Sequence, residues 1–243
     1  MSGVARWLRG LALGVAMAAA LTGCASVERT SADAKRGVEA MVTHPVRYRV
    51  AGADPALRGN LDRAQAELAA GNHRAAISLL NRAVWDMERI QKRGLRLAEL
   101  VVVYDALGQA NAAMGVVDLA EEARRLARSL TEAAAREPSP GAVELLARAK
   151  DAYVSAQFRE ALRGLKQALI DLADIVDVET RITAVAETRC YLAFAYFATQ
   201  ERTRARDELR RLSAFDPGFD VCGRDAPPGV RALMVDLRRQ NEL

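Results

Sequence analysis

Residues 156–169 read A-Q-F-R-E-A-L-R-G-L-K-Q-A-L, and this stretch indicates the fold class. Within it, Ala161 is followed by Leu165 four residues later and by Ala168 three residues after that. Residues three and four apart share one face of an α-helix, so the stretch predicts an amphipathic helix with small residues on its packing face. The residues just before Phe158 predict a tight turn that follows an earlier helix.

This pattern of helix, tight turn and second amphipathic helix occurs four times along the chain. The four segments are 61–84, 97–130, 143–176 and 186–217. The small residue near each turn is an alanine, and the four alanines are Ala76, Ala120, Ala161 and Ala205. Their spacings are 44, 41 and 44 residues. A large apolar residue follows four positions later in three segments, whereas the second segment has Arg124 there.

The four segments resemble tetratricopeptide repeats. In that family the second helix of each repeat carries an alanine near the turn and a large apolar residue four positions later, and the period is about 34 residues. The resemblance implies an all-α fold, a right-handed array of about four helix pairs over residues 54–217. Asp54 and Pro55 predict the start of its first helix. Residues 218–243 then form a loop and a C-terminal capping helix. The longer period predicts longer helices or linkers than the family usually has.

The composition agrees with a helical protein. Hydrophobic residues make up 51% of the chain, aromatic residues only 5%, and Gly and Pro are few. No part after the N-terminal segment alternates long enough to predict a sheet. Removal of residues 1–23, which contain Arg6 and Arg9 and no acid, lowers the formal charge from +4 to about +2. A near-neutral chain argues against nucleic acid as a partner.

The N-terminus predicts export and lipid attachment. Arg6 and Arg9 precede a short apolar run at residues 11–21, which is the order of a secretory signal. The run ends in Leu21-Thr22-Gly23-Cys24, which resembles the lipobox of bacterial lipoproteins. The resemblance implies cleavage after residue 23, acylation of Cys24 and a flexible tether over residues 24–53. Because no Asp follows the cysteine, the resemblance also implies the outer membrane and a domain that faces the periplasm.

The remaining cysteines predict a disulfide. Only Cys190 and Cys222 remain after acylation of Cys24, and an even pair in an oxidising compartment is a candidate bond. If the capping helix runs parallel to the first helix of the fourth pair, the two cysteines come close together. Two separate buried thiols are the alternative.

The sequence offers no catalytic or metal-binding constellation. The two histidines, His44 and His73, have no Cys or carboxylate cluster around them, and no Gly-rich loop fits a phosphate. We therefore expect no enzyme activity and no cofactor. The arginines at 202–211 alternate with Glu201, Asp207 and Glu208, which we interpret as a screened surface rather than an anion site.

The remaining indication of function is the predicted shape of the helix array. Stacked helix pairs form a concave surface lined by the first helix of each pair, and such surfaces bind proteins or peptides. Alignment on the repeat alanines predicts that this groove contains Asp105, Gln109, Lys150, Tyr153, Phe194 and Phe197. The aromatic residues predict partner binding. Packing of Phe194 and Phe197 against the C-terminal helix is an equal alternative.

The resemblance implies a lipid-anchored scaffold or assembly factor of a cell-envelope machine, such as a gliding-motility or pilus-secretin complex. An adaptor for peptidoglycan hydrolases or a factor in outer-membrane protein assembly is the alternative. A periplasmic enzyme or a solute-binding component would need a polar pocket, for which the sequence has no candidate residues.

Overall fold

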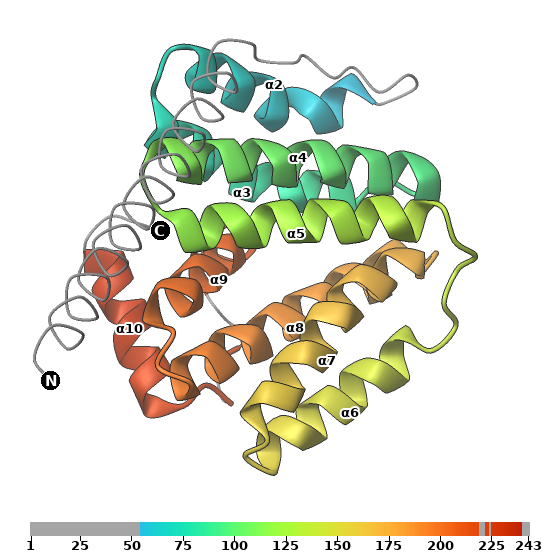
Figure 1. Ribbon diagram of the computed structural model, residues 1–243, viewed down its shortest axis with the longest axis vertical. Helices are drawn as coiled ribbons and strands as arrows, with labels where there is room; N and C mark the ends of the chain where they lie inside the picture. Colours follow the sequence, from blue (N-terminus) through green and yellow to red (C-terminus); the bar gives the residue numbers. More distant parts are fainter. Residues whose placement is uncertain (1–53, 219–221, 224, 240–243) are drawn as a thin grey trace, which may run out of the picture. The chain divides into compact units, whose positions relative to one another are not determined.

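The regular structure in the described residues is helical, as the sequence predicted, and these residues contain no strand. The computed structural model describes residues 54–218, 222–223 and 225–239 (Figure 1). The predicted signal peptide, Cys24 and the tether lie outside the described residues. The helices are α2 (Pro55–Ala69), α3 (His73–Glu88), α4 (Arg93–Ala113), α5 (Val117–Ala134), α6 (Ala142–Val154), α7 (Phe158–Asp171), α8 (Val178–Ala198), α9 (Arg202–Phe215) and α10 (Pro228–Arg239), with a 3-10 turn, η1, at Leu172–Asp174.

The start of α2 follows the sequence prediction. The helix begins at Pro55, and the side chain of Asp54 accepts a hydrogen bond of 2.9 Å from the backbone N–H of Ala56. Proline fits this position because the first helical N–H groups have no partner within the helix.

Helices α2 to α9 form four consecutive pairs, α2–α3, α4–α5, α6–α7 and α8–α9, whose members pack against each other. The turn inside every pair has the same structure. One residue adopts the left-handed conformation, and the next residue donates a backbone hydrogen bond back to the fifth residue before it. The left-handed residues are Gly71 (φ 78°), Gly115 (φ 74°), Ala156 (φ 58°) and Gln200 (φ 66°).

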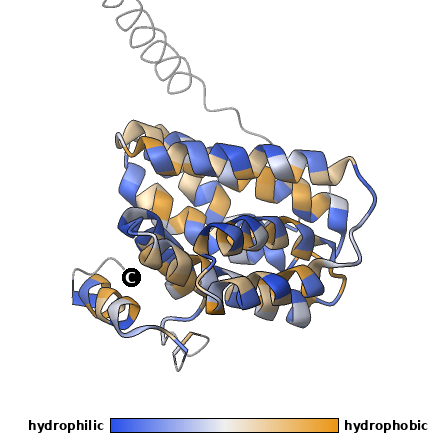
Figure 2. Ribbon diagram, turned by 60° about the horizontal axis from the view of Figure 1, so that its bottom comes forward, coloured by the Kyte–Doolittle hydropathy of each residue, from blue (hydrophilic) through white to orange (hydrophobic). Residues whose placement is uncertain are grey.

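Each repeat alanine lies five residues after the left-handed residue of its turn and is buried. Its N–H donates to the carbonyl of the residue that immediately precedes the second helix of the pair. A small side chain at this position lets the two helices of a pair approach closely. The sequence pattern therefore marks a real structural repeat. Figure 2 shows that apolar and polar residues alternate along the helices, as expected for helices that pack through one face.

The four pairs also repeat two by two, with a period of 85 residues along the chain. Helix α4 begins at Arg93 and ends at Ala113, and α8 begins and ends 85 residues later. The starts of α3 and α7, and of α5 and α9, have the same offset. We call α2–α5 (Pro55–Ala134) the first half and α6–α9 (Ala142–Phe215) the second half.

Two equivalent arginines join the halves. Arg96 donates to the backbone carbonyls of Ile90 and Gln91 before its own helix, and to that of Ala173 at the end of η1. Arg181, its equivalent, makes the same three kinds of bond. Its acceptors are the carbonyls of Ile175, Val176 and Glu88, the last at the end of α3. Each half thus satisfies the helix end of the other, and such reciprocity is the mark of a two-fold relation.

The halves also exchange apolar side chains. Trp85 of α3 joins the buried cluster of the second half, where its ring stacks on Phe215 with centroids 4.5 Å apart. Its equivalent in α7, Ile170, joins the buried cluster of the first half. Helix α3 accordingly contacts α9, and α5 contacts α7. In an open array each repeat touches only its neighbours, so the contact between the first and the last pair departs from that arrangement.

Helix α10 lies on α8 and α9 and buries Val230, Leu233, Met234 and Leu237. Its first turn meets the end of α8, because a Cβ on Gly229 would lie 2.5 Å from the ring of Phe197. Its last turn meets the end of α9, where Arg238 donates to the carbonyl of Gly218 at 3.0 Å. The helix therefore runs antiparallel to α8, and the predicted parallel course is wrong. The bond from Cys190 in α8 to Cys222, which precedes α10, agrees with a return of the chain toward the end of α8 before α10 begins.

Candidate functional site

Three of the six predicted groove residues meet in one place. Tyr153 on α6 lies against Phe194 on α8, and Lys150, also on α6, lies over the ring of Tyr191, which neighbours both aromatic residues. We call Tyr153, Phe158, Tyr191 and Phe194 the aromatic cluster. The Tyr153 ring lies 5.5 Å from Tyr191, 5.7 Å from Phe158 and 6.2 Å from Phe194. These are the separations at which aromatic rings attract each other.

The aromatic cluster has a buried floor and a half-exposed rim. Phe194 is 2% exposed and belongs to the core, whereas Tyr153, Phe158 and Tyr191 are half-buried. Lys150 forms an ion pair with Glu187 and holds its ammonium group 5.3 Å from the centre of the Tyr191 ring. The rim therefore presents two phenol groups and one paired cation to solvent.

Phe197 has a different role from the aromatic cluster. Its ring lies against Gly229 of α10. The alternative interpretation, that the ring packs on the C-terminal helix, is therefore correct for Phe197. Phe194 instead contacts the rings of Tyr153 and Tyr191.

Asp105 and Gln109 lie in the first half, on α4, which packs on α2, α3 and α5, whereas α6 packs on α7 and α8. Asp105 lies near Arg124 and Arg128 of α5; burial raises the pKa of its carboxyl, and the two arginines partly offset this rise. The predicted set is thus divided between the two halves rather than gathered along one groove. Repeat alignment finds equivalent positions in different helix pairs, but it does not show whether the pairs stack into one continuous groove.

The structure explains the departure at Arg124. A Cβ on Gly108 would lie 3.0 Å from Cγ of Arg124, so the glycine leaves space for the stem of this long side chain. The equivalent residue of the second half is Leu209, which is buried.

Cys190 and Cys222 are brought together. Their Sγ atoms are bonded, their Cα atoms are 5.7 Å apart, and both residues are buried. Cys190 lies in the middle of α8 rather than near its start, and Cys222 lies between α9 and α10 in the chain.

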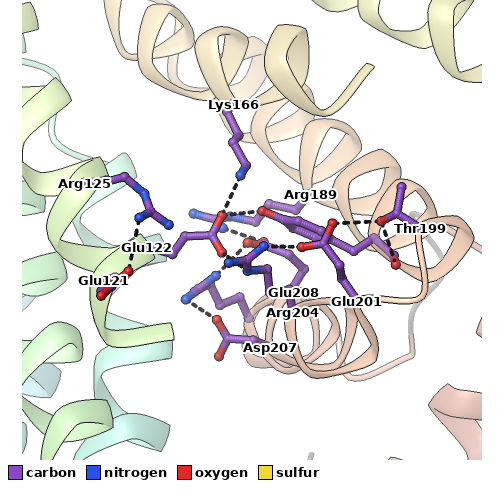
Figure 3. Close-up of polar contacts among 12 residues, drawn as sticks. Glu121, Glu122, Arg125, Lys166, Arg189, Thr199, Glu201, Arg204, Asp207 and Glu208 are labelled. Carbon is purple, nitrogen blue, oxygen red and sulfur yellow. Dashed lines mark hydrogen bonds and ion pairs between the residues drawn. The ribbon is translucent and has the colours of Figure 1, made fainter. Parts of the chain in front are cut away.

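A network of charged residues lies between the halves, and the sequence did not predict it. Its carboxylates and cations balance one for one, and Figure 3 shows most of them. The members are Glu122, Glu201, Asp207, Glu208, Lys166, Arg189, Arg204 and Arg211. The predicted screened surface on α9 is therefore wrong for Asp207, Glu208 and Arg211, which are buried. The neighbouring Arg206 and Arg210 are half-buried, and local spacing does not tell which face of α9 the first half covers.

The innermost part of the network surrounds Arg189. Its guanidinium lies 2.8 Å from a carboxylate oxygen of Glu208, and the other oxygen of Glu208 lies 2.7 Å from Arg211. Trp85 donates from Nε1 to the backbone carbonyl of Arg211 at 2.7 Å. Burial of so many charges is tolerated because each has a partner of opposite sign.

The outer part surrounds Glu122 on α5. Lys166, Tyr196 and Arg204, from α7, α8 and α9, all contact its carboxylate. Burial raises the pKa of Glu122, but the Tyr196 hydrogen bond and the charges on Lys166 and Arg204 outweigh burial and lower it overall. Burial, followed by the nearby Glu122 charge, raises the pKa of Tyr196, so its hydroxyl remains a donor.

Within the described residues, no group of three or more His, Cys, Asp and Glu side chains is placed to hold a metal ion. The described helices also include none that is long and apolar enough to cross a membrane. Comparison with family models, curated proteins and solved structures finds no match to this chain.

Proposed function

We propose that this protein is a non-enzymatic scaffold, held at a bacterial membrane by lipid on Cys24, that binds an envelope protein through the second half. The observation that carries the proposal is the aromatic cluster with its half-exposed Tyr153 and Tyr191. Tyrosines supply large, rigid contact surfaces at interfaces and retain a polar end for hydrogen bonding.

The four helix pairs with one shared turn structure support a relation to tetratricopeptide repeats. Folds of this kind mainly present surfaces to other proteins. The departures are the 85-residue period and the contact of the first pair with the last. In our proposal the chain is a repeat protein that has closed on itself, which leaves its outer faces for partners.

The first half supplies a matched control for the proposed surface. Tyr153 and Tyr191 are equivalent to Leu68 and Ala106, so the first half has the same scaffold without the aromatic rings. A partner that recognises the rings therefore binds the second half and ignores the equivalent face of the first.

The experiment is a pull-down from solubilised envelope with tagged protein, in which Tyr153→Ala and Tyr191→Ala are compared with Leu68→Ala. We expect the tyrosine variants to lose the partner and the Leu68 variant to retain it, with the helical content unchanged in all three. Retention of the partner by the double tyrosine variant would place the binding surface elsewhere.

Lipid attachment is tested separately. Cells that express the protein should incorporate a palmitate analogue into it, and Cys24→Ala should abolish the label. Fractionation of the labelled protein with the outer membrane tests the proposed location. Label that persists in the Cys24 variant would exclude the anchor.

A further inference from the structure

The carboxylate of Glu122 lies in a site built entirely by the other half. One of its oxygens lies 3.0 Å from Nζ of Lys166 and also accepts a hydrogen bond from the Tyr196 hydroxyl. The other oxygen lies 3.0 Å from Nε of Arg204. Figure 3 shows Lys166 and Arg204 converging on Glu122 from two directions. Two cations and one hydroxyl group, from three helices, therefore surround one carboxylate.

These donors are held by contacts other than those with Glu122. Arg204 is paired with Glu201, whose carboxylate also accepts a hydrogen bond of 3.0 Å from Thr199. The cations of Lys166 and Arg204 lie 5.2 Å and 5.8 Å from the centre of the Tyr196 ring. Because the Tyr196 side chain is buried, its O–H needs an acceptor at this point. The site is organised to receive a carboxylate before one arrives.

The site exists only in the second half. The first-half equivalents of Lys166, Tyr196 and Arg204 are Asn81, Asn111 and Leu119, which cannot supply two cations. Asp207, the equivalent of Glu122, is paired instead with Arg211 on its own helix. The two-fold relation therefore does not repeat this cluster in the first half, and only the second half supplies the two cations and the hydroxyl group.

We infer that Lys166, Tyr196 and Arg204 form a carboxylate-binding site for an acidic group of a partner, with the side chain of Glu122 as the resident ligand of the free protein. The site opens to solvent, because the side chains of Lys166, Arg204 and Glu122 are 43%, 25% and 23% exposed. Its chemistry suits a carboxylate, because two cations and one hydroxyl donor already converge on the two oxygens of Glu122.

A partner carboxylate enters by displacing Glu122, which frees α5 from α7 at this point. The halves remain joined, because Arg96, Arg181 and Trp85 make their contacts elsewhere. The inference adds a chemical class of ligand to the proposed scaffold function. It concerns residues outside the aromatic cluster, so the two proposals can fail independently.

Glu122→Ala tests the site, because the atoms removed beyond Cβ correspond to an acetate ion. We expect acetate to raise the thermal unfolding midpoint of this variant saturably, since a ligand that binds only the folded state stabilises it. Sodium chloride at equal ionic strength should not do so. Glu122→Gln fills the same space with a neutral amide and should not respond to acetate. Glu122→Ser is the second variant if the alanine variant does not fold.

Two peptides show whether the partner supplies the carboxylate from a glutamate side chain or from its C-terminus. One has an internal Glu between blocked ends, and the other has glycines with a free C-terminus. Binding of either to Glu122→Ala, measured by calorimetry and lost in Glu122→Ala with Lys166→Ala, supports the site and names the source. In the wild-type protein, the peptide that binds should accelerate amide exchange in α5, and its amide counterpart should not. An absent acetate effect, an equal effect in Glu122→Gln or unchanged exchange in α5 would each overturn the inference.

Discussion

Tyr104 and Arg189 occupy equivalent positions in the two halves, 85 residues apart, and Arg189 donates a hydrogen bond to the hydroxyl of Tyr104. Both residues are buried. Around a two-fold axis, residues at equivalent positions meet each other, so identical side chains would oppose tyrosine to tyrosine or arginine to arginine. Different residues at the two positions allow one donor to meet one acceptor.

We expect Tyr104→Phe to lower the free energy of unfolding by about 1.5–3 kcal/mol, because a hydrogen bond to a charged group is lost in the interior. Tyr104→Arg should cost more, since it places two guanidinium groups side by side. Urea denaturation measures both. Arg125→Met serves as control, because Arg125 forms an exposed ion pair with Glu121 and its loss should change stability by only about 0.5 kcal/mol. Equal costs in all three variants would contradict the role of the Tyr104 contact.

The four left-handed turn residues give opposite predictions. Ala156 and Gln200 hold this conformation with a side chain, so Ala156→Gly and Gln200→Gly should each stabilise the protein by about 0.5–1 kcal/mol. Gly71→Ala and Gly115→Ala should destabilise it by about 1 kcal/mol. A Cβ at either glycine would meet no neighbour, so the backbone conformation alone causes the cost. Thermal unfolding of the four variants tests the pattern, and a uniform sign would refute it.

Phe194 and Tyr153 should respond differently to truncation. Phe194 is a core residue, and we expect Phe194→Ala to lower the free energy of unfolding by about 3–5 kcal/mol. Tyr153→Ala should lower the free energy of unfolding by clearly less, because the Tyr153 side chain is only half-buried. Chemical denaturation of both variants provides the measurement. A small cost at Phe194 would mean that this ring is available to a partner after all.

The bond between Cys190 and Cys222 should contribute to stability. In the chain-entropy model, a link across 32 residues stabilises the folded state by about 3–4 kcal/mol. We expect the Cys190→Ala, Cys222→Ala double variant to lose roughly this amount in urea denaturation. Alkylation of the exported wild-type protein, unfolded without reductant, should modify neither cysteine. Two modified cysteines would show that the exported protein lacks the bond.

The contact at Glu122 should weaken in acid. The pKa of Glu122 lies below its ordinary value of 4.5, so its carboxylate contributes stability above that pH. The contribution is lost as the pH falls through the lower pKa of the folded state. We therefore expect the stability difference between wild type and Glu122→Gln to be constant from neutral pH to about 4.5 and to shrink below it. Urea denaturation across this range provides the measurement, and a difference that grows on acidification would contradict it.

Some parts of the structure could be predicted because they depend on neighbours along the chain. The helix start at Asp54 and Pro55, the turns and the buried alanines follow from capping, backbone conformation and helical periodicity. The spacing of the alanines also contained the 85-residue period. The equivalence of Arg96 and Arg181 is visible in the sequence once this offset is applied.

The sequence by itself therefore determined that the domain is helical, where its pairs turn and which small residues pack within each pair. Only the tertiary structure decided that the two halves close on each other. That contact brings Arg189 to Tyr104 and places Trp85 in the core of the other half. The physical reason is that helical periodicity reports which residues share a face. Which faces meet across 85 residues depends on the complementarity of whole surfaces in size and charge.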